Sequence, residues 1–577
     1  MKLKNITVLL GLLLSFSIYA QEKNDTIKTD KLIIIKQYSP TLNDAFKVKT
    51  KPSISDSIKT SQKTVDYSIF SVPVASTFTP VKGVAGSVKP EAMPYNYQNY
   101  ARLGAGNFTN ILGQFYGSLF LDRYKKLNIE FDHLSSAGGI DGVRLDDDFL
   151  DTSLDLNLES SARYFAWDAG IGVDYKRYNW YGVDENNIDL NNQIFNTDLS
   201  AIDPLQTYLG LKAYGGLEFD SDYIKTVKLK VNNFSDDYDS SENQIDLQGD
   251  FKFYIQNETL DLGINLNYLS GSFDQSFNQP TSGIDYGYLS ASIQPSYQYK
   301  AGDLTLDIGL KASLLNDTEL SETEIFVYPK FKASYKWSDE MIFYAGADGD
   351  LNQNTYQSIV EQNPFVSPTL FLQPTDNAVT GFAGVSGKIG SLSYNAKAFY
   401  KQENNYAFFV ENISGFAPFF PQNNFEFSNS FGLIYDDLST LGLQAEINYA
   451  AFDNFNIGVS AQFFDYSVDN LPEPSYLPEF KVNLNANYQI GEKWYLHSTL
   501  FFVGERESER FFISTLKDPI TVDSFIDLNI GIDYQFTERL GVFISGKNLL
   551  DDNYEQWRNY KVQGLQVMGG LSYQFDW

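Results

Sequence analysis

Two clusters of carboxylates are the residues of this sequence that could hold a metal ion. They are Asp146, Asp147, Asp148 and Asp151, and Asp236, Asp237, Asp239 and Glu242. Calcium takes six to eight oxygen ligands, and clusters of this kind could supply several of them. Acidic runs in loops are more often simply solvated, so both interpretations stay open. We therefore assign no catalytic, cofactor-binding or metal-binding residue and expect no cofactor.

Residues that would support other chemistry are scarce. The chain contains no cysteine, which excludes thiol nucleophiles, disulfides, zinc fingers and lipoprotein acylation. Its two histidines, His133 and His497, lie far apart in sequence, which excludes HEXXH-type metal chemistry. The sequence has neither a Walker A loop nor a GxSxG nucleophile elbow. We therefore predict that the protein is not an enzyme.

Length and charge narrow the class of protein further. The chain has 577 residues and a formal charge of −30, so it repels phosphate and is a poor candidate for binding nucleic acid. Aromatic residues make up 16% of it, mostly 39 Tyr and 45 Phe, against only 4 Met. This composition indicates one large, polar, strand-rich domain rather than several soluble ones.

The first twenty residues are typical of an export signal. Lys2 and Lys4 form a basic start, residues 8–16 form a short apolar core, and Ala20 precedes Gln21 at the expected cleavage point. No later stretch approaches the roughly 18 apolar residues of a membrane helix. A secreted soluble protein or an outer-membrane β-barrel remains.

Alternating hydrophobicity predicts strands with one apolar and one polar face. Within residues 522–536 the even positions from Ile526 to Phe536 are apolar and the odd positions are mostly polar, and residues 260–268, 304–314 and 480–490 repeat the pattern. A soluble sandwich could also produce this alternation. Many of these segments run for 12–16 residues, however, whereas a tilted membrane strand needs about 9–11 and soluble strands have about 5–6.

Aromatic residues and connections also favour a membrane barrel. Aromatic side chains cluster near strand ends, as at Tyr175–Tyr181 and Trp494–Tyr495, which suits a membrane interface. Short and long connections alternate, as they do in bacterial outer-membrane barrels. The short ones are 123–126, 160–163, 219–222, 256–258, 300–303, 338–340, 389–391, 453–455, 490–493 and 536–539.

We therefore predict an all-β fold, a transmembrane antiparallel β-barrel of about 22 strands over residues 98–577. The count is uncertain by two strands because residues 426–452 are either one long strand or a hairpin around Asp436–Ser439.

The C-terminus carries the most specific signal. The last strand, 565–577, places apolar residues at alternate positions and ends on Trp577, which resembles the signal that barrel-assembly machinery recognises. Upstream, Asn548-Leu549-Leu550-Asp551-Asp552-Asn553-Tyr554 leads toward Tyr573-Gln574-Phe575. Residues 520–577 thereby resemble the C-terminal end of TonB-dependent receptors. The resemblance implies a barrel in outer-membrane lipid that takes up a solute.

The N-terminal side departs from that family, which carries a plug domain before its barrel. Here residues 21–97 hold no plug-like motif, and we interpret them as a periplasmic arm that substitutes for the plug. With eleven Lys and seven acids the arm is basic, whereas residues 98–577 hold 30 basic and 66 acidic residues. The arm could therefore fold into an acidic lumen. Residues 31–36 could dock as a strand on a periplasmic partner, or pair within this chain.

Three functions fit these expectations. The first is a receptor or transporter that binds a solute, with a surface lipoprotein as a partner. The second is a plugless barrel subunit of a larger outer-membrane assembly or secretion complex, and the third is a passive diffusion porin. The apolar loop Phe416–Pro421 is either a surface for a ligand or partner, or an anchor on lipid headgroups. A missing plug favours the second function, and the C-terminal resemblance favours the first.

Overall fold

The computed structural model describes residues 97–577, except residues 163, 184–201, 257, 278–282, 414–422, 453 and 513–514. The chain divides into two compact units, and the barrel belongs to the unit that contains Tyr97–Trp577. The expected signal peptide 1–20, the arm up to residue 96 with its docking strand 31–36, and the loop Phe416–Pro421 all lie outside the described residues.

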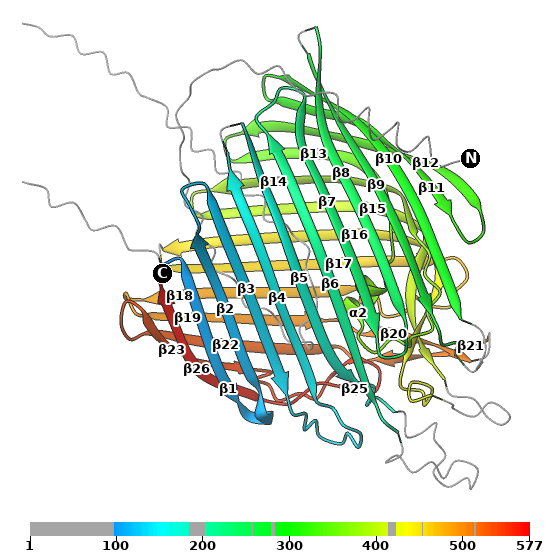
Figure 1. Ribbon diagram of the computed structural model, residues 1–577, viewed down its shortest axis with the longest axis vertical. Helices are drawn as coiled ribbons and strands as arrows, with labels where there is room; N and C mark the ends of the chain where they lie inside the picture. Colours follow the sequence, from blue (N-terminus) through cyan, green and yellow to red (C-terminus); the bar gives the residue numbers. More distant parts are fainter. Residues whose placement is uncertain are drawn as a thin grey trace, which may run out of the picture. The chain divides into compact units, whose positions relative to one another are not determined.

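Within the described residues, a single sheet of 24 strands forms the barrel. Of these, 22 build its wall, and β20 (Arg506–Phe512) and β21 (Thr515–Val522) form a hairpin in one long loop (Figure 1). The wall strands are β1 (Asn99–Gly106), β2 (Ile111–Phe120), β3 (Lys125–Ser136), β4 (Phe149–Ser161), β5 (Phe165–Asn179), β6 (Leu205–Phe219), β7 (Ile224–Asp236), β8 (Ser241–Ile255), β9 (Glu258–Phe273), β10 (Ile284–Ala301), β11 (Leu304–Asp317), β12 (Glu322–Ser338), β13 (Met341–Asn352), β14 (Thr375–Ile389), β15 (Leu392–Asn412), β16 (Phe431–Phe452), β17 (Phe455–Val468), β18 (Phe480–Ile490), β19 (Trp494–Val503), β22 (Phe525–Gln535), β23 (Leu540–Lys547) and β26 (Gln566–Phe575). The loops add η2 (Asn107–Thr109), α2 (Tyr356–Gln362), β24 (Glu555–Trp557) and β25 (Tyr560–Lys561).

The wall closes because its first and last strands pair. β1 is antiparallel to β2 on one side and to β26 on the other, with Asn99 opposite Phe575. Closure leaves no unpaired strand edge in the wall, which is the condition for a sheet to cross a membrane. Each of the short connections expected from the sequence joins two neighbouring antiparallel strands. We call the end of the barrel with these connections the turn end, and the opposite end the loop end.

The uncertain segment 426–452 forms one strand. β16 runs from Phe431 to Phe452 and pairs with β15 from Phe431 to Tyr449 and with β17 from Leu438 to Phe452. The hairpin around Asp436–Ser439 is therefore wrong, and the count of 22 is confirmed. The polar residues that suggested a turn lie opposite a bulge in β15 between Glu403 and Tyr406. A bulge shifts the register locally without ending the pairing.

The two faces of the wall match the predicted alternation. On β8, Ile245 and Leu247 are exposed on the outer face, while Asp246 accepts hydrogen bonds from the amides of Asn265 and Asn267 on the inner face. An apolar outer face and a polar inner face are the pattern of outer-membrane barrels. In the part of the chain that the structure describes, no helix is long and apolar enough to cross a membrane.

The aromatic residues at strand ends divide into two groups. Trp337, Phe452, Phe536 and Trp577, at the turn end, are strongly exposed, as expected at a membrane interface. Tyr178 and Trp180 are buried, so their assignment to that interface is wrong. Their rings lie among the loops at the other end of the barrel, where Trp180 packs 5.6 Å from Phe425 between ring centroids.

Candidate functional site

The inner surface of the wall changes character along each strand. On β7, Lys228 and Lys230 face the lumen near the turn end and are exposed to solvent, whereas Phe234 near the loop end is buried. On β8, likewise, Gln248 and Asp250 are exposed and Glu242 is buried. All of these residues lie on the inner face of the wall. The difference in burial therefore means that another segment of the chain covers this face at the loop end and leaves it open near the turn end.

The covering segment is the connection between β13 and β14, residues 353–374, which we call the cap. Its helix α2 begins after Thr355, whose hydroxyl accepts a hydrogen bond from the Ser358 amide, while Ser358 Oγ accepts one from the Thr355 amide. This capping box satisfies two amides that the first helical turn would leave free. Tyr356 and Ile359, on the first turns, are buried.

Two carboxylates of the wall hold the start of the cap helix. Tyr356 Oη donates to Asp236 Oδ2 over 2.6 Å, and the Tyr356 amide donates to Glu242 Oε2 over 2.6 Å. Glu242 also accepts hydrogen bonds from Tyr286 Oη and from the Gln357 amide. A negative charge near a helix N-terminus is favourable because the free amides there carry partial positive charge. Burial raises the pKa of Tyr356 well above its usual value, so the phenol stays protonated and donates.

Aromatic rings from the wall form the seat of the cap. Tyr356 packs edge-on against Phe234 and Phe273, with centroid distances of 5.1 and 4.9 Å. Tyr208 stacks on Phe234, and its hydroxyl donates to the Pro364 carbonyl over 2.8 Å. Edge-to-face and stacked contacts of this kind contribute about 0.5–1.5 kcal/mol each beyond the burial of area.

The other part of the cap is held by β16 and a distant loop. The Ser367 amide donates to the Phe431 carbonyl over 2.8 Å, and the Phe431 amide donates to the Phe365 carbonyl. Phe365 also stacks on Tyr560 of β25, with ring centroids 3.6 Å apart. β7 and β16 are nearly opposite each other in the ring of 22 strands. The cap therefore crosses the lumen from one wall to the other.

Further loops pack beside the cap at the same end. Tyr560 Oη donates to the Asn429 carbonyl, and Asn429 Nδ2 donates to the Trp180 carbonyl. The guanidinium of Arg558 pairs with Glu411 at the end of β15. Figure 1 shows α2, β20, β21 and β25 toward the same end of the barrel. Segments of several loops therefore pack around the cap at the loop end of the lumen.

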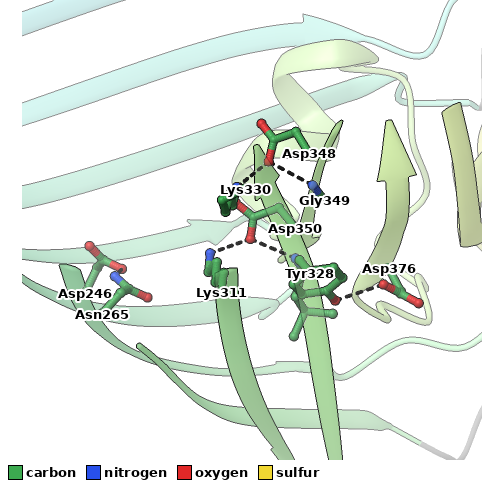
Figure 2. A network of polar contacts seen from close by, with 10 residues as sticks. Asp246, Asn265, Lys311, Tyr328, Lys330, Asp348, Gly349, Asp350 and Asp376 are labelled. Atoms are coloured by element: carbon green, nitrogen blue, oxygen red, sulfur yellow. Dashed lines mark hydrogen bonds and ion pairs between the residues drawn. The ribbon is translucent and has the colours of Figure 1, made fainter. Parts of the chain in front are cut away.

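On the turn-end side of the cap, the wall carries paired charges. Lys330 Nζ lies 2.5 Å from Asp348, and Lys311 pairs with Asp350. Tyr328 Oη donates to Asp376 Oδ1 over 2.8 Å, which extends the network across four strands (Figure 2). Surface pairs of this kind contribute little stability because water screens them. They do give this part of the lumen wall a pattern of fixed charges.

The carboxylate clusters singled out in the sequence do not form metal sites among the described residues, where no group of three or more His, Cys, Asp or Glu could hold an ion. Asp236 and Glu242 bind the cap instead. Asp147 accepts hydrogen bonds from the Gly139 and Ile140 amides, and Asp148 pairs with Arg177. These carboxylates organise loops.

The cap did not stand out in the sequence. Residues 353–374 fall in one of the long connections that alternate with the short ones, although they contain a capping sequence from Thr355 to Ser358 followed by several apolar residues. The apolar residues are Ile359, Val360, Phe365, Val366, Leu370 and Leu372. A helix start and an apolar run inside a loop would have indicated a segment that folds back against the barrel.

A closed 22-stranded barrel with an apolar outer face and a segment that crosses one end of its lumen has the architecture of a large outer-membrane β-barrel. Residues 90–549 match the family described as TonB dependent receptor-like, beta-barrel. The chain belongs to this family, whose members are receptors and transporters of the outer membrane. The predicted location in the outer membrane and the predicted resemblance are therefore confirmed.

Solved structures with a similar fold include three receptors. The ferripyoverdine receptor of Pseudomonas aeruginosa has a TM-score of 0.61 and 14% identity, over 83% of this chain and 72% of that one. The ferric-catecholate import receptor Fiu of E. coli K12 has a TM-score of 0.60 and 10% identity, over 84% and 82%. The siderophore receptor PirA of Acinetobacter baumannii has a TM-score of 0.60 and 11% identity, over 84% and 81%. These identities establish a shared fold and nothing finer. A comparison with curated proteins gave no significant match.

Proposed function

We propose that this protein is an outer-membrane receptor that admits a solute to its lumen, with the cap as its gate. The observation that carries the proposal is the contrast along the lumen, which is exposed to solvent from the turn end and covered at the loop end by a segment anchored on both walls. A barrel of this width normally needs a plug, because 16–18 strands already leave an aqueous channel. The cap would supply that closure, and its displacement would open the lumen.

A few residues make most of the contacts that attach the start of the cap to the wall, so the loss of those contacts would release it. Tyr356 contributes a phenol, an amide and a ring that all contact the wall. Asp236 and Glu242 receive them at one place. A solute that competed for these groups, or moved β7 relative to β8, would release the cap from this wall, and full opening of the lumen would also require its release from β16.

The test is swelling of proteoliposomes in an isosmotic solution of L-arabinose. Wild-type protein should give slow swelling, and Tyr356→Ala should give fast swelling because the cap no longer seals the lumen. Tyr223→Ala, at an exposed position at the turn end, is the matched control and should behave like wild type. Heat-modifiable mobility on gels would show that each barrel is folded.

A folded Tyr356→Ala barrel that stays impermeable would contradict the proposal. It would favour the assembly-subunit alternative, in which the lumen is blocked permanently and the surfaces serve partners.

Partners of the terminal segments are proposed on the sequence alone. The strand that ends at Trp577 would be recognised by barrel-assembly machinery, and residues 31–36 would dock on a periplasmic protein. Residues 1–20 would be removed on export, and the arm 21–97 would remain in the periplasm. A surface lipoprotein would fit the receptor function, and its co-purification with the intact protein would test this.

A further inference from the structure

A row of aromatic side chains crosses the inner wall between the cap and the turn end. In the antiparallel register Gly346 of β13 lies opposite Phe382, Phe382 opposite Phe399, Phe399 opposite Gly442, and Gly442 opposite Phe464. One level of the wall on β13–β17 therefore consists of phenylalanine and glycine. Tyr344, two residues from Gly346 on β13, adds a ring 6.2 Å from that of Phe382. We call Tyr344, Phe382, Phe399 and Phe464 the aromatic strip.

The glycines explain how these rings lie. A Cβ atom on Gly442 would fall 2.2 Å from Cζ of Phe399, and one on Gly346 would fall 2.6 Å from Cζ of Phe382. Each ring therefore occupies the space that the neighbouring strand leaves free by having no side chain. A ring that lies across the wall turns one face to the backbone and the other toward the lumen.

Covering glycine backbone is a structural role that aromatic residues take in sheets, and it accounts for part of this arrangement. It does not explain why four aromatic rings lie on the inner face, since the inner face of an outer-membrane barrel is ordinarily polar. All four rings are half-buried, so each keeps part of its surface toward the lumen. Phe399 and Phe464 lie 6.3 Å apart between centroids, which continues the row across the glycine of β16.

Two lysines accompany the strip. Lys397 Nζ lies between two rings, 5.3 Å from the centroid of Phe382 and 5.1 Å from that of Phe399. Lys332 Nζ lies 5.8 Å from the centroid of Tyr344. Within the described residues, neither ammonium makes an ion pair with a carboxylate. Lysines nearby on the same strands do form ion pairs: Lys330 of β12 pairs with Asp348, and Lys401 of β15 pairs with Glu403.

We infer that the aromatic strip binds a solute anion that has a flat apolar face, of the class of aromatic carboxylates. The ring faces would stack on the flat face of the solute, and the ammonium groups of Lys397 and Lys332 would pair with its carboxylate. The commitment to an anion rests on these two charges, neither of which lies within ion-pair distance of a carboxylate among the described residues. This inference rests on the proposed function, since it names the class of solute that would enter the lumen.

Thiol labelling can test this inference. The chain contains no cysteine, so a single introduced cysteine is the only residue that the reagent can label. Gln444 faces the lumen opposite Lys397, so Gln444→Cys places a reporter beside the strip without removing any of its groups. Gln248→Cys, on the inner face of β8, is the matched control elsewhere on the wall. Each full-length protein is labelled with a water-soluble methanethiosulfonate in detergent, with and without 2-naphthoate.

The expected result is that 2-naphthoate slows labelling of Gln444→Cys several-fold and leaves Gln248→Cys unchanged. 2-Naphthylmethylamine, a cation of similar shape, should not protect, and neither should cyclohexanecarboxylate, which lacks the flat face. Adding Lys397→Met to the reporter should abolish protection by 2-naphthoate. Phe399→Leu, which keeps an apolar side chain, should weaken it.

Two outcomes would overturn the inference. Labelling of Gln444→Cys that is equally fast with and without 2-naphthoate would show that the strip binds no such anion. A thiol at position 444 that never reacts in the folded protein would show that another segment, such as the arm 21–97, covers the strip. Either result could occur while Tyr356→Ala still makes proteoliposomes permeable, so failure here is distinguishable from failure of the proposed function.

Discussion

The same strands line both halves of the lumen, but the inner surface is buried near the loop end and exposed to solvent near the turn end. Near the loop end, inward residues of β6, β7 and β9 are buried aromatic side chains that pack against the cap, and Tyr208 of β6 also donates a hydrogen bond to it. Near the turn end, inward residues of β7 and β8 are charged or amide side chains exposed to solvent. The loop half resembles the core of a soluble protein, and the turn half resembles a protein surface folded inward.

This difference indicates which half of the lumen contributes more tertiary contacts to the stability of the barrel. Backbone pairing between neighbouring strands continues through both halves of the wall, so it does not distinguish them. Desolvated contacts are strong and depend on geometry, whereas exposed charge pairs contribute about 0–1 kcal/mol. Substitutions of equal chemistry should therefore have large effects at the cap and small effects on the open wall.

The largest effect is expected for Tyr356→Ala. Loss of a fully buried aromatic side chain costs about 3–5 kcal/mol, here drawn from the attachment of the cap. Hydrogen exchange measured by mass spectrometry should show faster exchange of the amides of α2, with the wall strands unchanged. Unchanged protection of α2 would contradict the comparison, because it would mean that the cap does not depend on this seat.

The second effect compares one chemical change in both halves. Glu242→Gln replaces a buried carboxyl group that accepts three hydrogen bonds with an amide that has a single acceptor oxygen. The expected cost is about 1–3 kcal/mol, because a buried donor left without its acceptor loses about that much. Asp250→Asn, at the exposed turn end of the same strand, should cost less than about 0.5 kcal/mol. Urea titration followed by a fluorophore on the cap would measure both, and equal costs would break the comparison.

A third, smaller effect concerns a single neutral hydrogen bond. Tyr208→Phe removes the donor to the Pro364 carbonyl and keeps the ring stacked on Phe234, so it should weaken the cap by about 1 kcal/mol. Tyr299→Phe, on the exposed outer face of β10, is the control and should have no measurable effect. Urea titration followed by the fluorophore on the cap would measure both variants. If Tyr299→Phe weakened the cap as much as Tyr208→Phe, the loss could not be attributed to the hydrogen bond to Pro364.

The smallest effect on stability is expected for Lys330→Met. Its partners Asp348 and Asp350 stay hydrated in the open half of the lumen, so the loss should be below about 1 kcal/mol and should shrink further at high salt. Thermal unfolding at two salt concentrations would test this. A loss of several kcal/mol that ignored salt would show that this half of the wall is desolvated after all.

Much of the wall was predictable from sequence because its rules are local. A period of two in hydrophobicity assigns each residue of a strand to a face, and the tight turns set the register of each hairpin. This is why strands such as 480–490 coincide with β18 and why the count of 22 is confirmed. The exception, 426–452, was ambiguous because polar residues opposite a bulge resemble a turn.

The cap was not predictable in the same way because its contacts are long-range. Nothing in the sequence near Asp236 or Glu242 indicates that their partner is Tyr356, more than a hundred residues away. Acidic residues in a loop fit a metal site, a solvated surface and a helix anchor equally well. Similarly, Tyr178 and Trp180 have the spacing of an interface belt, but packing against distant loops buries them.

A reversible covalent lock would show whether the cap closes the lumen. Ser367 in the cap and Ser430 beside β16 both contact the side-chain amide of Asn412, so Ser367→Cys with Ser430→Cys places two thiols side by side in a chain without other cysteines. Single-channel recording in a planar bilayer with moderate urea should show large openings for the reduced variant and for wild type. The oxidised variant should show none, and a reductant should restore them. Openings of equal size and frequency in the oxidised and reduced states, or free conduction by wild type without urea, would contradict the claim.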